Sequence, residues 1–320
     1  MGLGGVGMRE RELITLLREI FKPSDRLANE LRVGIGDDAA VFAPGKSLVA
    51  TSTDVLTEGI HFNRTWSDAK TIGRKAAIAN LADIFAMGMR PNFLLVSATI
   101  ENLDDGTLLE IAQGIQLEVE RVGAQVIGGD LSSGQGLTLS ITSFGEGDRS
   151  VRRSDAKHGD DLYLTRLPGR SLLGLTQLNK GIRINPESVD FHLIPECDWA
   201  TFEKAGEIAT AMIDISDGVA KDGLEIAQAS GVCLEIESEL LFEHPDFPPV
   251  AKLVSELGLD ALETILSSGE EHTPFFTASP SDRSLVESFA HRVGGVTGDR
   301  AGEILLDGAP LKVEGFDHFS

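Results

Sequence analysis

The sequence is poor in cysteine, and this scarcity excludes two kinds of site. Its 320 residues contain only Cys197 and Cys233, which do not form a CxxC pair. A cysteine-based zinc site and a disulfide framework are therefore excluded. Two widely separated cysteines are typical of a protein that works in a reducing cytosol.

Positive charge is also scarce. The sequence has 28 lysine and arginine residues but 50 acidic residues, which gives a formal net charge of −22. Nucleic acids and anionic membranes would be repelled by such a chain, so we expect neither as a partner. A phosphorylated ligand remains compatible with this charge if divalent cations bind between the ligand and the protein. For most of the acidic residues, keeping the protein soluble is the better interpretation.

The sequence has no long apolar runs. The longest, FLLVSATI (93–100), is far shorter than the roughly 20 residues that a membrane-spanning helix needs. No charged start followed by an apolar stretch occurs at the N-terminus, so we expect no signal peptide and a cytoplasmic protein.

The length of the chain indicates two domains, because 320 residues exceed one ordinary core. The apolar pattern breaks near GDRSVRRSDAKHGD (147–160), which places the boundary at about residue 150 and divides the chain into 1–150 and 151–320. In the first half the predicted order is strand, strand, helix, strand, helix, strand, strand. This order is typical of an α/β (α+β) domain with an antiparallel component.

The stretch GIGDDAAVF (34–42) fits the glycine pattern of a dinucleotide-binding turn, but its surroundings do not. Such a turn must open a helix of about ten residues or more, and the turn signal Pro44-Gly45 comes too soon after Gly36. The segments 39–43 and 47–56 instead predict two strands joined by the PGK turn. A P-loop is excluded as well, because it would need glycine where Ala40 stands.

Several acidic residues stand at predicted strand ends or beside small residues, where hard cations bind. They are Asp37 with Asp38, Asp54, Asp83, Asp130, and Asp214 with Asp217. Asp83 follows Asn80 by three residues in a helix predicted over 67–91, so the two share a face. Mg²⁺ binds through a few carboxylates, phosphate oxygens and water. Each acid taken singly could equally serve in a turn or as a helix N-cap, as in DISDG (214–218).

Six segments together resemble the thiamine-monophosphate kinase family. They are GIGDDAAVF (34–42), STDVLTEGIHF (52–62), GRKAAIANLADIFAMGMRP (73–91), IGGDLSSG (127–134), AMIDISDG (211–218) and GFDHF (315–319). This family belongs to the superfamily of aminoimidazole ribonucleotide synthetase, selenophosphate synthetase and HypE. The resemblance implies transfer of the γ-phosphoryl group of ATP to thiamine monophosphate, with several Mg²⁺ ions and without a P-loop.

Matched position by position, the resemblance also implies the site residues. The metal ligands would be Asp38, Ser52, Thr53, Asp54, Asp83, Asp130, Asp214 and Asp217, of which Asp54, Asp130 and Asp217 are expected to carry catalysis. Contacts to ATP would come from Gly129, Asp130, Arg153 and Ser216. Contacts to the substrate would come from His61, Glu270 and Phe316. For His61, a structural role is the alternative.

The resemblance further implies how the domains are used. Domain 1–150 would bind metal and ATP, and its mixed sheet would pair with that of a second copy to form a barrel in a homodimer. Domain 151–320 would be a mixed sheet flanked by helices that completes the ATP and substrate sites.

Two segments of the second half depart from the family pattern. The usual Gly-Gly-Glu-Asp-Tyr is here SGEEH (268–272), and the usual Arg-His-x-x-Pro is FHLIP (191–195). Three interpretations therefore remain: a thiamine-monophosphate kinase, an ATP-dependent relative acting on another small phosphate or acid, and a catalytically silent nucleotide- or metal-binding protein. The retained acids disfavour the third.

Overall fold

The computed structural model describes residues 10–22, 24–27, 29–35, 39–101 and 105–311, so Asp37, Asp38 and Phe316 lie outside the described residues. The chain forms two compact units. One comprises Met1–Ile84 with Arg90–Asp148, and the other comprises Phe85–Met89 with Arg149–Ser320. The grouping of 85–89 with the second unit was not predicted, and the functions assigned to domains 1–150 and 151–320 stay predictions.

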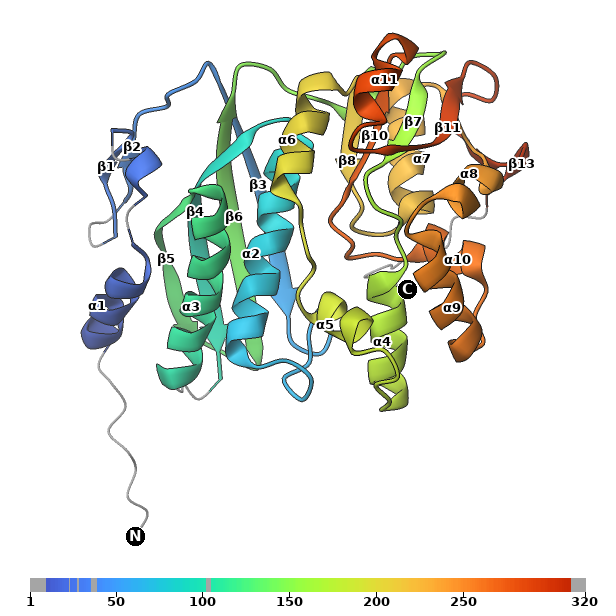
Figure 1. The fold of residues 1–320 in the computed structure, drawn as a ribbon. Helices are drawn as coiled ribbons and strands as arrows, with labels where there is room; N and C mark the ends of the chain where they lie inside the picture. The colour runs from blue at the N-terminus through green and yellow to red at the C-terminus, as the bar shows by residue number, and fades with distance from the viewer. Residues whose placement is uncertain (1–9, 23, 28, 36–38, 102–104, 312–320) are drawn as a thin grey trace. The chain divides into compact units, whose positions relative to one another are not determined.

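The first unit is built on a four-stranded sheet with the order β3-β6-β4-β5 (Figure 1). Strands β4 and β5 are parallel, and the other neighbours are antiparallel. Its elements are α1 (Glu10–Ile20), β1 (Leu31–Val33), β2 (Val41–Phe42), β3 (Leu48–Thr57), α2 (Ala69–Ala86), β4 (Arg90–Ile100), α3 (Asp105–Val122), β5 (Gln125–Ser133) and β6 (Leu137–Gly147).

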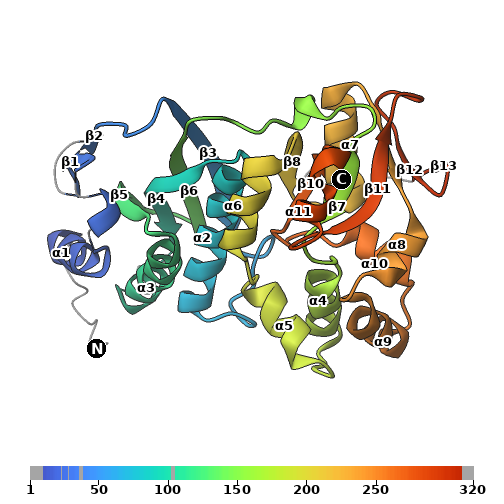
Figure 2. The same ribbon diagram turned by 45° about the horizontal axis from the view of Figure 1, so that its top comes forward.

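Helices α2 and α3 lie against one face of this sheet (Figures 1 and 2). Burial alternates along β6, as expected for a strand with one covered face. The two helices approach each other closely at their glycines. A Cβ atom on Gly73 would lie 2.1 Å from the carbonyl oxygen of Ile111, and one on Gly114 would lie 2.0 Å from that of Lys70. Only glycine permits this backbone contact, which fixes α2 beside α3.

The two strands predicted around the PGK turn do not pair with each other. The short β2 pairs with β1, whereas β3 pairs along its whole length with β6. The backbone N–H groups of Gly45 and Lys46 donate to Oε2 of Glu146 at 2.8 and 3.1 Å. The turn is therefore bound to β6 and does not close a hairpin.

The second unit contains a seven-stranded sheet with the order β13-β12-β9-β11-β7-β10-β8, in which only the β9–β12 pair is parallel. Its strands are β7 (Asp161–Leu164), β8 (Ala211–Asp214), β9 (Cys233–Ile236), β10 (Pro274–Ala278), β11 (His291–Thr297), β12 (Ile304–Leu306) and β13 (Ala309–Pro310). Its helices are α4 (Arg170–Lys180), α5 (Pro186–Leu193), α6 (Trp199–Ile208), α7 (Val219–Ser230), α8 (Ser238–Glu243), α9 (Phe247–Leu257), α10 (Ala261–Ser267) and α11 (Arg283–Val286).

Both faces of this sheet are buried. Leu162 and Phe275 belong to one apolar core, which also includes residues of α7, α9 and α10. Tyr163 and Phe276, the next residues along the same strands, belong to a second core with residues of α6 and α11. Strands that are covered on both faces have nearly continuous apolar sequences, as β7, β8 and β10 do. Mixed sheets with flanking helices confirm the predicted α/β class.

None of the helices among the described residues combines the length and the apolar composition needed to cross a membrane.

Candidate active site

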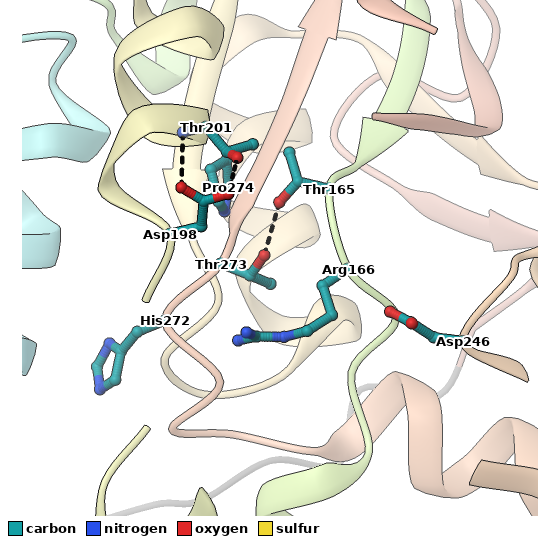
Figure 3. A pocket seen from close by; sticks show the side chains of 8 residues that line it. All are labelled: Thr165, Arg166, Asp198, Thr201, Asp246, His272, Thr273 and Pro274. Atoms are coloured by element: carbon teal, nitrogen blue, oxygen red, sulfur yellow. Dashed lines mark hydrogen bonds between the residues drawn. The ribbon is translucent and has the colours of Figure 1, made fainter. Parts of the chain in front are cut away.

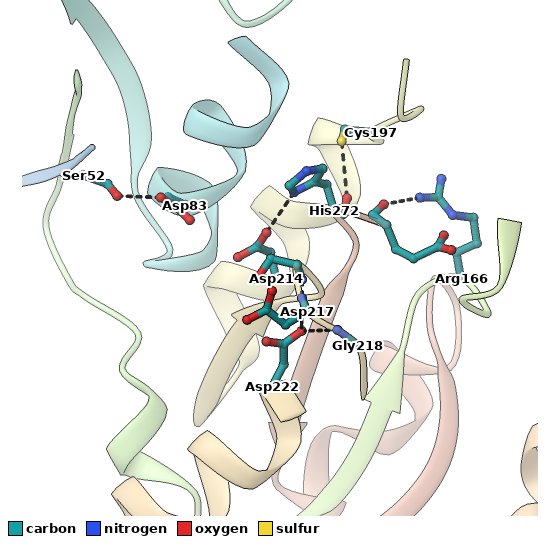
Figure 4. Close-up of polar contacts among 11 residues, drawn as sticks. Ser52, Asp83, Arg166, Cys197, Asp214, Asp217, Gly218, Asp222 and His272 are labelled. Atoms are coloured by element: carbon teal, nitrogen blue, oxygen red, sulfur yellow. Dashed lines mark hydrogen bonds and ion pairs between the residues drawn. The ribbon is translucent and has the colours of Figure 1, made fainter. Parts of the chain in front are cut away.

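Strand β3 and helix α2 hold the first group of predicted site residues. Oγ of Ser52 donates to Oδ2 of Asp83 at 2.5 Å (Figure 4). The backbone N–H of Asp54 donates to Oδ1 of Asn80 at 3.2 Å, and Asn80 is fully buried. The predicted shared face of Asn80 and Asp83 is thus the face toward β3. Ser52, Asp54 and Asp83 together offer hydroxyl and carboxylate oxygens within one unit.

Asp130 lies on the opposite edge strand of the same sheet. One row of paired residues crosses the sheet through Asp54, Ile141, Val96 and Gly129, and Asp130 is the next residue on β5. Three strand spacings separate the ends of this row by on the order of 14 Å. A single ion therefore cannot contact both Asp54 and Asp130 of one sheet.

Gly129 is required where it stands, because a Cβ atom there would lie 1.8 Å from the carbonyl oxygen of Val96. Asp130 is exposed, and its Oδ2 accepts a hydrogen bond from Oγ of Ser132 at 2.9 Å. On β3, Oγ1 of Thr53 lies 2.7 Å from Oγ1 of Thr142 on β6. The hydroxyl of Thr53 is thus engaged with the sheet, while its backbone carbonyl belongs to the strand.

His61 follows β3 in a turn. Its Nδ1 accepts a hydrogen bond from the backbone N–H of Thr57 at 3.0 Å, so the neutral ring carries its hydrogen on Nε2. Nζ of Lys75 donates to the carbonyl oxygen of His61 at 3.0 Å. Thr57 lies three residues beyond Asp54, or about 10 Å along the strand. The ring therefore has a structural contact through Nδ1.

In the second unit, Asp214 ends β8 and the loop 215–218 closes around Asp222. Oδ2 of Asp222 accepts hydrogen bonds from the backbone N–H groups of Ser216, Asp217 and Gly218 at 3.0, 3.0 and 3.1 Å (Figure 4). The alternative that the DISDG acids cap the following helix is wrong, because Gly218 is the N-cap of α7 without a side-chain cap. Asp222 was missed by the sequence reasoning; its signal was an acid in the first turn after DISDG.

The carboxyl groups of Asp214, Asp217 and Asp222 are close enough in this loop to act on one another. Burial, followed by the nearby carboxylate of Asp214, raises the pKa of Asp222 to about 8, although the N–H donors of Asp217 and Ser216 act in the opposite direction. Nζ of Lys221 lies 2.7 Å from Oδ2 of Asp217 and offsets part of the charge. Such a loop favours a bound cation.

The segment 268–273 is hydrogen-bonded to this acidic loop. The backbone N–H of Glu270 donates to the carbonyl oxygen of Ser216 at 2.7 Å, and that of His272 donates to Ile215 at 2.9 Å. A Cβ atom on Gly269 would lie 2.6 Å from the Ser216 carbonyl oxygen, so the two loops are in close backbone contact. The predicted substrate residue Glu270 and the predicted ATP residue Ser216 are therefore brought together.

The two segments that depart from the family pattern meet in the structure. Oε2 of Glu270 lies 3.6 Å from Nδ1 of the buried His192, which also lies 3.0 Å from Oγ of Ser171. Glu270 has φ 54°, a left-handed conformation that is uncommon outside glycine. His192 thus supports Glu270 from the 191–195 segment.

Two of the three changed residues of SGEEH, Glu271 and His272, have structural partners. Oε1 of Glu271 accepts from the backbone N–H groups of Gly169 and Ser171 at 2.8 and 2.9 Å, which caps the start of α4. Nδ1 of His272 lies 3.0 Å from Oδ2 of Asp214. Neither side chain replaces the aromatic surface that the family usually has at this point.

Arg153 lies beside α7, where its side chain forms an ion pair with Glu225 and is about half exposed. Its carbonyl oxygen accepts from Oγ of Ser230 at 2.6 Å. Arg153 therefore lies beside α7, the helix that follows the acidic loop 215–218.

A small cavity of about 240 Å³ opens beside His272 (Figure 3). Its lining residues are Thr165, Arg166, Asp198, Thr201, Asp246, His272, Thr273 and Pro274. The hydroxyls of Thr165 and Thr273 lie 2.8 Å apart, and Nη2 of Arg166 donates to the carbonyl oxygen of Glu271 at 2.8 Å. This volume is below the usual range for whole ligands, so it suits only part of one.

The donor atoms in both units are oxygens, which suit Mg²⁺ and not soft metals. Within the described part of the chain, no three His, Cys, Asp or Glu side chains form a group that could hold a metal ion. Each unit by itself therefore offers a partial ligand set that phosphate oxygens and water would complete.

Comparisons with known proteins agree with this chemistry. Residues 36–147 match the family described as AIR synthase related protein, N-terminal domain. A thiamine-monophosphate kinase of Mycobacterium tuberculosis (strain CDC 1551 / Oshkosh) is 35% identical over 262 residues, which cover 79% of this chain and 78% of that protein. The solved structure of AaThiL complexed with AMPPCP and TMP is 27% identical with a TM-score of 0.79, covering 98% of this chain and 100% of that one.

A more distant likeness concerns the fold alone. Hydrogenase maturation protein HypE in complex with ATP has a TM-score of 0.74 at 19% identity, covering 98% of this chain and 96% of that chain. The Mycobacterium tuberculosis enzyme is 35% identical over 79% of this chain and 78% of its own length. This chain therefore belongs to the thiamine-monophosphate kinase family.

Proposed function

We propose that this protein transfers the γ-phosphoryl group of ATP in line to thiamine monophosphate, giving thiamine diphosphate. Its family is a kinase family, and its relative AaThiL was solved with AMPPCP and TMP. The observation that carries the proposal is the docking of the segment 268–273 on the loop 215–218, because it places Glu270 beside the acids of the DISDG motif.

The acidic residues are proposed to act through Mg²⁺, which when bound with ATP would offset phosphate charge and hold the reacting groups in line. In the first unit Ser52, Thr53, Asp54, Asp83 and Asp130 would be ligands, together with Asp38. In the second unit Asp214 and Asp217 would be ligands, and Asp222 would fix the loop that carries them. We expect turnover to depend most on Asp54, Asp130 and Asp217.

The remaining residues would position the two substrates. Gly129, Arg153 and Ser216 would contact ATP, and Phe316 would contact the thiamine rings. The carboxylate of Glu270, supported by His192, suits the cationic part of thiamine monophosphate. His61 would lie toward its phosphate. The attacking phosphate oxygen is already anionic near neutral pH, so no general base is assigned.

We also propose a homodimer, because β3 is a long edge strand that carries exposed apolar side chains. Within the described residues β3 pairs only with β6, and its side chains Leu48, Val49 and Val55 are 40%, 48% and 47% exposed. Exposed strand edges of this kind are usually covered. A second copy that placed its β5 beside β3 would close a barrel and bring Asp54 of one copy toward Asp130 of the other.

The test is the formation of thiamine diphosphate by the purified protein with ATP, Mg²⁺ and thiamine monophosphate. Product that requires both ATP and Mg²⁺ would support the assignment. A panel of other small phosphates and acids, each at millimolar concentration, should be turned over far more slowly. Turnover of one of these acceptors, without any from thiamine monophosphate, would assign the protein to another reaction of the superfamily. No turnover of any acceptor would indicate a silent binding protein.

A further inference from the structure

Among the described residues of the first unit, three buried side-chain oxygen atoms lack a hydrogen-bond partner: Oε1 of Gln116 on α3, Oδ1 of Asn92 on β4 and Oε1 of Glu146 on β6. Asn92 and Glu146 lie on neighbouring strands, and neither belongs to the candidate active site. The two residues are only 2% and 6% exposed. A buried polar atom left without a partner costs about 1–3 kcal/mol, so such an atom usually marks a water or an ion.

A third oxygen-bearing side chain joins these two. Nδ2 of Asn92 donates to Oε2 of Glu30 at 3.1 Å. A Cβ atom on Gly45 would lie 2.9 Å from Oε1 of Glu30 and 3.4 Å from Oε2 of Glu146. Both carboxylates therefore converge on Gly45. The register of β4 against β6 shifts between Pro91 and Phe93, and this irregularity is where Asn92 stands.

Nearby cations make other contacts. Nζ of Lys46 pairs with Asp148 at 2.7 Å. Arg26 donates to the carbonyl oxygens of Gly123 and Pro91. Burial and then the carboxylate of Glu146 raise the pKa of Glu30, and the charge of Arg26 opposes this shift without reversing it. At Glu30, burial and the neighbouring carboxylate therefore outweigh the charge of Arg26.

We propose that Glu30, Asn92 and Glu146 bind a hard divalent cation of the Ca²⁺ class. Carboxylate and amide oxygens are ligands for such ions, and Ca²⁺ accepts six to eight oxygens in flexible geometry, with water filling the remaining positions. A water molecule would donate hydrogen bonds to the oxygen atoms but would not balance the charge of the two carboxylates. A proton shared by Glu30 and Glu146 would remove charge but would leave Oδ1 of Asn92 without a partner.

The ion would link three segments that are distant in sequence. Glu30 precedes β1, Asn92 lies in β4, and Glu146 lies in β6 and also holds the turn at Gly45 and Lys46. The site is therefore structural, and it does not depend on the proposed kinase function. Its loss should change stability before it changes turnover.

Thermal unfolding of the full chain without nucleotide tests this inference, in EDTA and in increasing CaCl₂ or MgCl₂. The melting temperature of the wild type should rise by about 5 °C when Ca²⁺ exceeds its dissociation constant about a hundredfold. Glu30→Gln should lose most of this rise. In EDTA the same variant should melt at or above the wild-type temperature, because one of two repelling charges is gone. Glu187→Gln, at an exposed acid of the second unit, should keep the rise.

Bound Ca²⁺ counted after equilibrium dialysis is the second measurement. Glu146→Gln should hold one ion fewer than the wild type, whereas Glu187→Gln should hold as many ions as the wild type. Equal Ca²⁺ responses of the wild type and Glu30→Gln would overturn the proposal. A Glu30→Gln variant that melts below the wild type in EDTA would also overturn it, because the two carboxylates would then share a stabilising proton. If Glu146→Gln does not fold, the measurements on Glu30→Gln are sufficient for the test, because Glu30 is only half-buried.

Discussion

Nδ1 of His272 lies 3.0 Å from Oδ2 of Asp214, and both side chains are buried. A carboxylate can only accept, so Nδ1–H is the donor and holds Asp214 in one orientation. His272 is a position where the chain departs from the family pattern, whereas Asp214 is an acid that the pattern retains. The changed residue thereby acts as a positioning residue for a proposed metal ligand.

Replacing His272 with phenylalanine should weaken metal binding while leaving the ring volume nearly unchanged. Loss of a group that orients a ligand typically costs 10–100-fold in metal affinity. We expect the Mg²⁺ concentration for half-maximal activity to rise at least about tenfold, and calorimetric Mg²⁺ affinity to fall in parallel. His272→Gln, which keeps a donor, should recover part of the loss. Unchanged Mg²⁺ affinity in His272→Phe would argue against the positioning role.

Asp54→Asn should reduce turnover by about a hundredfold or more at saturating Mg²⁺, because it removes one charge from a proposed cation ligand. Its melting temperature should stay within a few degrees of the wild type. Asp148→Asn is the matched control, since that acid is exposed in the same unit and pairs with Lys46. Activity of Asp54→Asn within a few-fold of the control would contradict the metal assignment.

Glu270→Ala should raise the apparent KM for thiamine monophosphate more than it lowers kcat, because Glu270 is proposed to contact the non-reacting part of the acceptor. Phe316→Ala is expected to act in the same direction, and so is His192→Phe, which removes the contact to Glu270. Steady-state kinetics at varied acceptor concentration measure the changes in KM and kcat separately. Glu187→Ala, an exposed acid of the same unit, is the control. A fall in kcat at unchanged KM would place Glu270 nearer the reacting atoms.

A charge on the edge of β3 should dissociate the proposed dimer. Light scattering of the wild type should give about twice the chain mass of 34.2 kDa at micromolar concentration. Val49→Lys should shift the mass toward the monomer, because it places a charge on the paired edge. Leu285→Lys, at an exposed apolar position on α11, should leave the mass unchanged. A wild-type monomer at this concentration would contradict the dimer.

The buried His244 should make the protein less stable as the pH falls. Burial and the adjacent His291 lower its pKa to about 4 in the folded state. Between about pH 6.5 and pH 4 the unfolded chain then binds more protons, so this contribution to stability is complete above pH 6.5 and is lost toward pH 4. Urea unfolding of the wild type and His244→Gln across this range should show the difference shrinking with decreasing pH. A constant difference would contradict the shift.

Long segments with a clear period could be predicted from the sequence. Helix 105–122 and strand 137–147 have periodic patterns that many residues share, so errors at single positions matter little. Helix 69–86 was predicted from its alanines and from the end signals Gly88 and Pro91, and strand 90–100 from its apolar run. Helix α9 was not predicted, although its 11 residues are amphipathic. The shorter helices α5, α8 and α10 were also not predicted, because helices of their length gain most of their stability from packing on the rest of the domain, which a local pattern does not contain.

By itself, the sequence determined the chemistry available to this protein. Aspartates beside glycine, serine and threonine specify oxygen ligands for a hard cation, and the spacing after Gly36 excluded a dinucleotide turn. Only the tertiary structure decided which residues are neighbours. It set Asp54 and Asp130 three strands apart, placed Asp222 under the DISDG loop, and joined His272 to Asp214. The reason is physical: periodicity along a chain records which face a residue takes, whereas strand order and register are settled by the packing of distant segments.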